Sequence, residues 1–267
     1  MKNIDITEKI IYIGANDKDI DLFESQYIVP NGISYNSYLI MDEKIAIMDT
    51  IDRRKTEEWI HNLEKALDGR EPDYLIVSHG DFDHMGEAIN LVENFKVQKV
   101  IFNCGEFNNL EQDLIKVLDK KKIPYYSCVK ELNIDDNKLY FLNNKDYGNE
   151  NDNSSVIYTE LNNLKFLFMG DAGVEVEEDL IEEYNLQDID VLKVGHHGSK
   201  TSSSKEFINE INPKYSIISV GKNNRYGHPN KEVLDSLEDS KIYRTDEDGS
   251  IMFKIKNNKL KIETCSP

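Results

Sequence analysis

Four side chains able to bind a metal ion fall within one six-residue segment, 79–84. They are His79, Asp81, Asp83 and His84. Imidazole and carboxylate groups are common ligands of divalent metals, and Gly80 permits the tight turn that brings them together. Each residue alone could be an ordinary surface group, but the cluster predicts a metal site. A water bound to such a metal ionises near neutral pH and can attack an electrophile as hydroxide.

The elements on either side of this segment explain how its side chains could converge. Asp73–Ser78 is a continuous apolar run typical of a buried strand, and Met85–Phe95 follows as a predicted helix. A turn from strand to helix can direct several side chains to one point. The segment 79–84 is therefore expected at the carboxyl end of a strand.

Strands and amphipathic helices alternate along the rest of the chain. This predicts two sheets covered by helices, and no linker or low-complexity tract divides them. The predicted strands are 34–41, 44–49, 99–102, 140–142, 155–160, 165–169, 191–194, 215–220, 241–245, 250–255 and 259–263. The other predicted helices are 54–67, 109–120, 174–185, 204–211 and 230–238.

Segment 79–84 resembles the His-x-His-x-Asp-His signature of the metallo-β-lactamase superfamily, with Asp81 in place of the second histidine. Three later blocks, in the same order, resemble the hydrolase domain of the ComEC competence-protein family. They are Met169-Gly170-Asp171, Val194–Ser202 with its His196-His197-Gly198-Ser199 run, and Ile218–Gly221 followed by Asn224 to Pro229. This resemblance covers about residues 74–263. It implies an α/β fold, the four-layer αββα metallo-β-lactamase sandwich, as a single domain over residues 1–267.

The same resemblance implies a site for two divalent metal ions. His79 and Asp81 would hold one ion, Asp83 and His84 the other, and Asp171 would bridge them. A further histidine should complete the second position, and His196, His197 and His228 all remain candidates. The order of the strands slightly favours His228 as the ligand. His196 and His197 would then contact substrate or donate a proton, and we assign them to catalysis together with Asp83.

Other residues near these blocks are candidates for substrate binding. Asn153, or Ser154 beside it, could approach the metal or hydrogen-bond a substrate, and Ser199 and Lys200 follow the histidine pair. A site rich in carboxylate and poor in imidazole shifts the preferred metal from zinc toward manganese or iron. Occupancy by a single metal also stays open.

The first 72 residues resemble the start of flavodiiron proteins, which share the fold but reduce oxygen or nitric oxide at two irons. The resemblance rests on Ile13–Asp17, Phe23-Glu24, Gly32–Ile40, Asp42-Glu43-Lys44 and Met48-Asp49-Thr50. One hypothesis is a natural or engineered chimera, with residues 1–73 from a flavodiiron-like parent and 74–267 from a ComEC-like one.

Three functions therefore compete. The first is a metal-dependent hydrolase of phosphoesters, of the phosphodiesterase or nuclease kind. The second is a flavodiiron-type oxidoreductase without its flavodoxin domain, which is disfavoured because no histidine occurs between His84 and His196. The third is an engineered or inactive metal-binding scaffold. We favour hydrolysis because function follows the site rather than the fold.

Charge narrows the choice of substrate. The net charge is −18, which repels duplex nucleic acid and anionic membranes. Residues 193–231, however, carry seven lysines and arginines against Glu206 and Glu210. This locally basic stretch favours a small anionic substrate, a phosphoester or a single-stranded nucleic acid. It could also be a chance fluctuation on a solvated face.

The apolar runs, the first residues and the cysteines predict where the protein is located and whether it contains a disulfide. No apolar run is long enough to span a bilayer and the first residues have no apolar signal core, so a cytoplasmic location without membrane contact is expected. Cys104, Cys128 and Cys265 are odd in number and far apart, which predicts separate thiols rather than a disulfide. The sequence leaves the oligomeric state open.

Overall fold

The computed structural model describes most of the chain. The described residues are 4–5, 10–20, 22–23, 27–28, 32–41, 43–134, 137–221, 224, 226–256 and 259–265. Glu24 and Asp42 of the flavodiiron-like motifs, and Lys222 and Arg225 of the basic stretch, lie outside these residues. No described helix combines the length and apolar character that crossing a bilayer requires.

The first sheet has seven strands and is formed by the first half of the chain. In spatial order they are β1 (Ile4–Asp5), β2 (Ile10–Tyr12), β7 (Tyr38–Met41), β8 (Ile45–Met48), β9 (Tyr74–Ile76), β10 (Lys99–Phe102) and β11 (Tyr125–Ser127). The strands from β8 to β11 are parallel, so the loops after them leave the sheet at one edge. Two short pairs accompany this half, β3 (Ala15–Asp17) with β6 (Ile33–Tyr35) and β4 (Leu22–Phe23) with β5 (Tyr27–Ile28).

The second sheet also has seven strands and is formed by the second half. In spatial order they are β12 (Glu131–Ile134), β13 (Asn137–Phe141), β14 (Ile157–Leu161), β15 (Leu164–Phe168), β16 (Val191–Lys193), β17 (Tyr215–Ile218) and β18 (Lys241–Arg244). Strands β15 to β18 are parallel. The hairpin β19 (Ser250–Lys256) and β20 (Lys259–Cys265) packs over this sheet through apolar side chains of β19 and β20.

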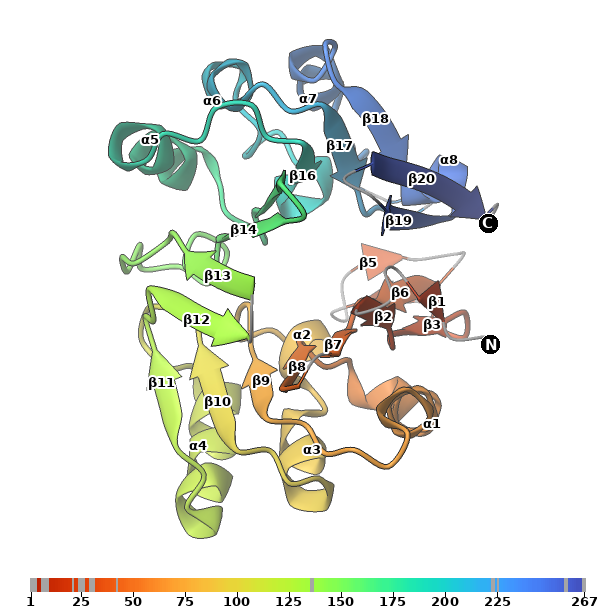
Figure 1. Ribbon diagram of the computed structural model, residues 1–267, viewed down its shortest axis with the longest axis vertical. Coiled ribbons are helices and arrows are strands. Elements are labelled where there is room, and N and C mark those ends of the chain that lie inside the picture. The colour runs from red at the N-terminus through yellow and green to blue at the C-terminus, as the bar shows by residue number, and fades with distance from the viewer. Residues whose placement is uncertain are drawn as a thin grey trace.

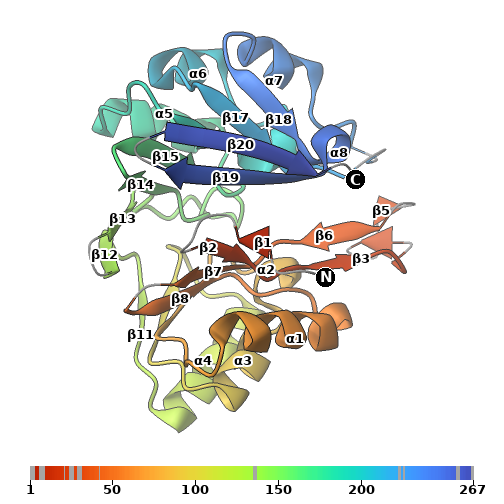
Figure 2. The ribbon, with the colours of Figure 1, turned by 45° about the vertical axis from the view of Figure 1, so that its right-hand side comes forward.

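Helices cover the outer face of each sheet, as Figures 1 and 2 show. The first sheet carries α1 (Thr56–Leu67), α3 (Ala88–Asn94) and α4 (Asn109–Lys121), and the second carries α5 (Val174–Glu183), α6 (Lys205–Ile211) and α7 (Lys231–Ser236). Shorter turns are η1 (Arg53–Lys55), α2 (Phe82–Met85), η2 (Gly195–Gly198) and α8 (Thr245–Asp248). The predicted αββα layering is confirmed.

Successive side chains of a strand point to opposite faces of the sheet, so the buried apolar residues form separate layers on the two faces. Ile45 and Ile47 face the helices of the first half, whereas Ala46 between them faces the second sheet. Leu39, Ile45, Ile47, Leu75 and Val77 are all fully buried in one cluster with residues of the helices. Between the sheets, Tyr74 and Ile76 pack with residues of β12 to β14. Burial of side chains on both faces of these strands explains their continuous apolar sequences.

The predicted absence of a disulfide is wrong, because Cys104 and Cys128 are bonded to each other. Cys104 follows β10 and Cys128 follows β11, and these two parallel strands are neighbours. A separation of 24 residues in sequence therefore becomes contact in space. The predicted helix Met85–Phe95 is also corrected, since it is divided between α2, which ends at Met85, and α3, which begins at Ala88.

Candidate metal centre

The histidine–aspartate segment sits in a turn held on one side by the end of β8 and on the other by the start of α4. Asp49, directly after β8, accepts a hydrogen bond from the Ser78 backbone N–H at 2.7 Å and one from the Ser78 hydroxyl at 2.8 Å. On the other side, Asn108 donates its side-chain N–H to the Gly80 carbonyl at 2.8 Å. A Cβ at position 80 would lie 2.1 Å from that Asn108 nitrogen, so the close approach requires glycine.

Within the turn, imidazoles and carboxylates form two pairs. His79 Nε2 lies 3.4 Å from an Asp81 carboxylate oxygen, and His84 Nε2 lies 3.5 Å from one of Asp83. The two imidazole rings are 4.0 Å apart between centroids. The segment thus brings its four predicted ligands together as two neighbouring pairs.

Asp171 reaches the same place from the second sheet. It follows β15, and its backbone N–H donates to the Ser154 hydroxyl at 3.0 Å. Burial raises the pKa of Asp171, but the imidazoles of His197, His79, His196 and His84 outweigh burial and hold that pKa well below its usual range. Asp171 therefore lies within electrostatic reach of histidines from both sheets.

The adjacent histidines face Asp171 from η2. His196 Nε2 lies 4.0 Å and His197 Nε2 lies 3.9 Å from the Asp171 carboxylate. Both residues have left-handed backbone conformations, with φ of 45° and 56°. The chain turns here because the His196 backbone N–H donates to the Gly170 carbonyl at 3.0 Å.

His228 stands further out. Its ring is 6.3 Å from that of His196 and stacks on Tyr226 at 5.1 Å between centroids. Its backbone N–H donates to the Asn224 side chain at 2.8 Å. Burial, with the neighbouring His196 and His197, lowers the pKa of His228 to about 4.

The orientation of the other imidazoles suits metal binding. His84 Nδ1 lies 3.0 Å from Asp49 and His197 Nδ1 lies 2.8 Å from the Ser219 carbonyl. His79 Nδ1 lies 3.2 Å from the Ser78 hydroxyl, and His196 Nδ1 lies 3.4 Å from the Thr201 hydroxyl. Each ring thus fixes Nδ1 on a neighbour and turns Nε2 toward a carboxylate, as metal-binding histidines do.

Spacing and charge provide a further test of fit. Two ligands about 2.1 Å from one tetrahedral ion lie roughly 3.4 Å apart, which the pairs His79–Asp81 and His84–Asp83 match. Burial lowers the pKa of His84, but the carboxylates of Asp83 and Asp49 outweigh burial and raise it to about 10, so the surroundings of this imidazole favour positive charge. Among the described residues, no three His, Cys, Asp or Glu side chains are arranged to bind a single metal ion together. The donor set fits divalent ions, with its ligands gathered in pairs.

The predicted substrate-binding residues are placed as follows. The Asn153 side chain is engaged within its own loop, with the Tyr147 N–H at 2.7 Å and Asp146 at 3.0 Å. Ser199 is buried and its hydroxyl lies 2.9 Å from that of Thr201. Lys200 is exposed, with its backbone N–H donating to Asn230 at 2.8 Å. Their roles in substrate binding stay predictions.

Sequence reasoning missed two residues that orient the site. Asp49 bonds His84, and Ser219 bonds His197. Each lies just beyond a parallel strand, Asp49 after β8 and Ser219 after β17. Their positions at strand ends next to the ligand-bearing strands were the available signal.

The sequence profile of the Metallo-beta-lactamase superfamily matches residues 32–222, more than half of the chain. The chain belongs to the metallo-β-lactamase superfamily.

Individual superfamily members are similar over different shares of the chain. ComE operon protein 3 of Bacillus subtilis (strain 168) is 34% identical over 195 residues, which are 70% of this chain and 25% of that protein. The anaerobic nitric oxide reductase flavorubredoxin of Vibrio vulnificus (strain YJ016) is 33% identical over 104 residues, 39% of this chain and 21% of that protein. The chain thus spans a quarter or less of each relative. Both resemblances expected from the sequence are confirmed.

A solved structure agrees with the superfamily fold. The metallo-beta-lactamase fold protein YhfI from Bacillus subtilis matches with a TM-score of 0.53, covering 96% of this chain and 99% of its own. The identity is 12%, so this likeness concerns the fold alone.

Proposed function

We propose that this chain hydrolyses a phosphoester with a metal-activated water, as a phosphodiesterase or nuclease-like enzyme. One observation carries the proposal. Asp171, from the second sheet, faces histidines of both sheets beside a turn that holds two imidazole–carboxylate pairs. This is the donor arrangement that a two-metal hydrolytic site needs.

Named residues would hold the ions. His79 and Asp81 would take one, Asp83 and His84 the other, and Asp171 would lie between them. Of the three remaining histidines, His197 is now the best placed to complete the second position, because Ser219 fixes its Nδ1 and its Nε2 faces Asp171. Two divalent ions, of zinc, manganese or iron, would lower the pKa of a bound water and stabilise the developing oxyanion.

The chain's own groups would do the rest. Asp49 holds the His84 ring in place through Nδ1, and Ser154 holds the backbone of Asp171. His228, whose lowered pKa leaves it neutral at pH 7, would accept a hydrogen bond from the substrate. The His196 ring is 6.3 Å from that of His228, and its Nε2 is 4.0 Å from Asp171. Burial lowers the pKa of His196, so it would contact the substrate as a neutral imidazole.

A small anionic substrate or a single strand of nucleic acid fits the charges near the site. Lys193 ends β16, close enough to Asp171 for that carboxylate to raise its pKa, although burial lowers that pKa further than Asp171 raises it. Lys200 is exposed beside the histidine pair. Lys200, the exposed lysine of the two, would give an anion a positive approach on an otherwise acidic protein.

Hydrolysis of bis-p-nitrophenyl phosphate tests the proposal. Protein loaded with Mn²⁺ or Zn²⁺ should release p-nitrophenol, and Asp83→Ala should reduce kcat by about 100-fold or more. Asp113→Ala on the exposed face of α4 is the matched control and should keep full activity. Equal turnover in Asp83→Ala and the control would remove the proposed role of Asp83. No turnover by any loaded protein would instead leave the chain as a metal-binding scaffold.

The similarity to flavorubredoxin supports a second candidate, a flavodiiron-type oxidoreductase. It predicts tightly bound iron and consumption of oxygen or nitric oxide with an external reductant. Elemental analysis of the purified protein separates the two, because manganese or zinc without iron would count against the oxidoreductase.

A further inference from the structure

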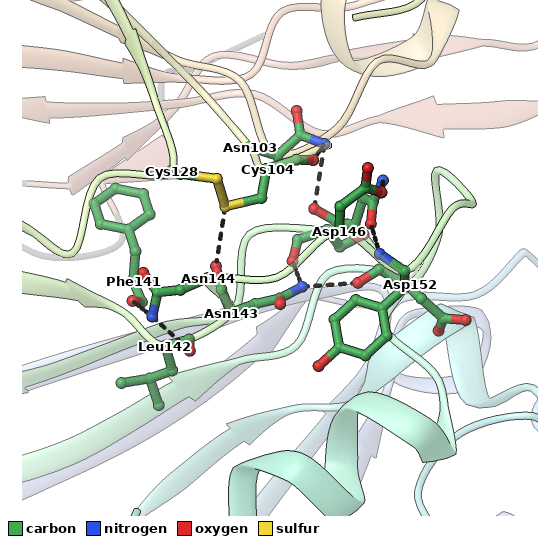
Figure 3. The surroundings of a disulfide bond; sticks show 12 residues. Asn103, Cys104, Cys128, Phe141, Leu142, Asn143, Asn144, Asp146 and Asp152 are labelled. Atoms are coloured by element: carbon green, nitrogen blue, oxygen red, sulfur yellow. Dashed lines mark hydrogen bonds between the residues drawn. A yellow bond between two sulfur atoms is a disulfide. The ribbon is translucent and has the colours of Figure 1, made fainter. Parts of the chain in front are cut away.

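The disulfide lies where the chain passes from one sheet to the other. Cys104 follows β10 and is 4% exposed, whereas Cys128 follows β11, is exposed, and is separated from β12 by two residues. Figure 3 shows the bond beside Asn103 and Asn143. The disulfide therefore ties the last two strands of the first sheet together at the start of the second.

A loop beside the candidate metal centre contacts Asn103 and Cys104. We call residues 143–154 the asparagine loop. Asn103, next to Cys104, donates its side-chain N–H to the Asn153 carbonyl at 3.2 Å. Sγ of Cys104 lies 3.7 Å from the Asn143 carbonyl oxygen, and the Asn143 side chain donates to the carbonyls of Asp152 at 2.7 Å and Ser154 at 2.8 Å (Figure 3).

The asparagine loop in turn holds both parts of the site. The hydroxyl of Ser154 accepts the Asp171 backbone N–H at 3.0 Å. The next residue, Ser155, donates its backbone N–H to the Ser78 carbonyl at 2.9 Å, immediately before His79. Hydrogen bonds through the asparagine loop thus connect Asn103, beside Cys104, with the Asp171 backbone and with Ser78, the residue before His79.

Non-covalent contacts alone hold this region incompletely. The side-chain oxygens of Asn103 and Asn143 are buried and have no hydrogen-bond donor among the described residues. A buried acceptor without a donor costs free energy, so a partly satisfied network is a weak restraint. The covalent link fixes the position of Cys104 and, through it, of Asn103, which donates to the loop.

We propose that Cys104 and Cys128 are a reversible redox modification site, and that their oxidation state sets how firmly the asparagine loop holds Asp171. The reagent class is a dithiol reductant. Cys128 is exposed, so a reductant in solution can reach the bond, and access is one of the factors that set the rate of thiol–disulfide exchange. The effect on hydrolysis rests on the proposed function, whereas the effect on the loop does not.

A dithiol reductant supplies the two electrons and two protons that reduction of the Cys104–Cys128 disulfide requires. Its thiolate attacks the sulfur of exposed Cys128, the S–S bond breaks, and the bonding pair leaves on Cys104, which takes a proton. The second thiol of the reductant attacks the mixed disulfide and releases Cys128, which takes the second proton. Two electrons and two protons reach the protein, and the reductant becomes a disulfide. Reduced Cys104 gains an S–H that can donate weakly to the Asn143 carbonyl.

Three measurements on the full chain test the proposal. Alkylation and mass spectrometry before and after dithiothreitol treatment count the free thiols. Hydrogen exchange then follows residues 143–154, and Mn²⁺ titration after anaerobic removal of the dithiothreitol measures metal affinity. Reduction should free two thiols, increase exchange in the loop and weaken Mn²⁺ binding by about tenfold, the scale of a displaced orienting group. Air oxidation should reverse all three changes.

Cysteine variants test whether the effects of dithiothreitol come from this disulfide. Cys104→Ala/Cys128→Ala should resemble the reduced protein and ignore dithiothreitol, whereas Cys265→Ala on β20 should respond like the wild type. Free Cys104 and Cys128 in the oxidised sample would overturn the proposal, as would unchanged exchange and Mn²⁺ affinity on reduction. Thiol counting, hydrogen exchange and Mn²⁺ titration do not use substrate. If no sample hydrolysed a phosphodiester, that result would overturn the proposed function and leave the disulfide proposal standing.

Discussion

The Asp49 carboxylate lies 3.0 Å from Nδ1 of His84 and at the same time binds the backbone and hydroxyl of Ser78. A single group at the end of β8 therefore positions both the start of the ligand turn and its last imidazole. Such a carboxylate fixes the ring orientation and raises the basicity of Nε2.

Asp49→Asn should weaken Mn²⁺ or Zn²⁺ binding by roughly 10- to 100-fold, because the amide is uncharged and can present a donor to Nδ1. Equilibrium dialysis with metal analysis measures the affinity. Asp113→Asn, on the exposed face of α4, is the control and should bind metal like the wild type. Equal affinity in the two variants would contradict the role given to Asp49.

Ser154→Ala should reduce both stability and metal affinity. The variant leaves the Asp171 backbone N–H without its acceptor, which costs about 1–3 kcal/mol for a buried group. Urea unfolding measures the loss, and Mn²⁺ titration measures the affinity. Ser216→Ala removes another buried hydroxyl, near the amino end of β17. It should lose stability without losing metal affinity, and the same pattern in Ser154→Ala would disprove the positioning role.

Gly80→Ala should destabilise the protein by about 1–3 kcal/mol, the usual cost of overpacking. The added Cβ would stand 2.1 Å from the Asn108 side chain, which caps α4. Serine at position 108 keeps an N-cap with a shorter side chain, so Gly80→Ala/Asn108→Ser should recover part of the loss. Urea unfolding of both variants is the measurement, and a Gly80→Ala protein as stable as wild type would show that the turn adjusts freely.

The Glu111 carboxyl makes stability depend on pH. Burial raises its pKa from 4.5 to about 7, the Asn108 backbone hydrogen bond opposes this rise, and the Glu150 carboxylate adds to it. Between pH 4.5 and 7 the unfolded chain has lost this proton while the folded chain keeps it, so rising pH favours unfolding.

Wild-type protein should therefore lose stability relative to Glu111→Gln as pH rises from about 4.5 through 7. Glutamine keeps the capping box at the start of α4, which isolates the charge. Urea unfolding with a metal chelator at several pH values measures the difference. Exposed Glu106→Gln is the control, and parallel pH profiles for wild type and Glu111→Gln would refute the prediction.

Periodicity predicted the elements that bury one clear face. The helix expected over 109–120 is α4, and its capping box is visible in the sequence as Asn108 with Glu111. The short edge strands β11 and β12 were missed because most of their residues are partly or fully exposed and show no clear alternation. Tertiary pairing, rather than local pattern, makes these segments strands.

The site shows the same division. The ligands of segment 79–84 are close in sequence, so the pattern itself predicts metal binding. Asp49 lies 35 residues from His84, and nothing in the sequence indicates that the two are in contact. The pairing of Cys104 with Cys128 was hidden for a similar reason. It depends on β10 and β11 being neighbours, and β11 itself carries no strong sequence signal.

Ala46, Ile47 and Met48 of β8 pair in parallel with Tyr74, Leu75 and Ile76 of β9. If the chain joins two parents near residue 73, as the chimera hypothesis holds, the junction would run along this ladder of main-chain hydrogen bonds, which depend little on side-chain identity. If the halves came from different parents, natural or engineered, little at this seam would have resisted the exchange. Such an exchange must still preserve side-chain packing beneath α1, where Trp59 and Leu63 share one buried cluster with Ile47 and Leu75.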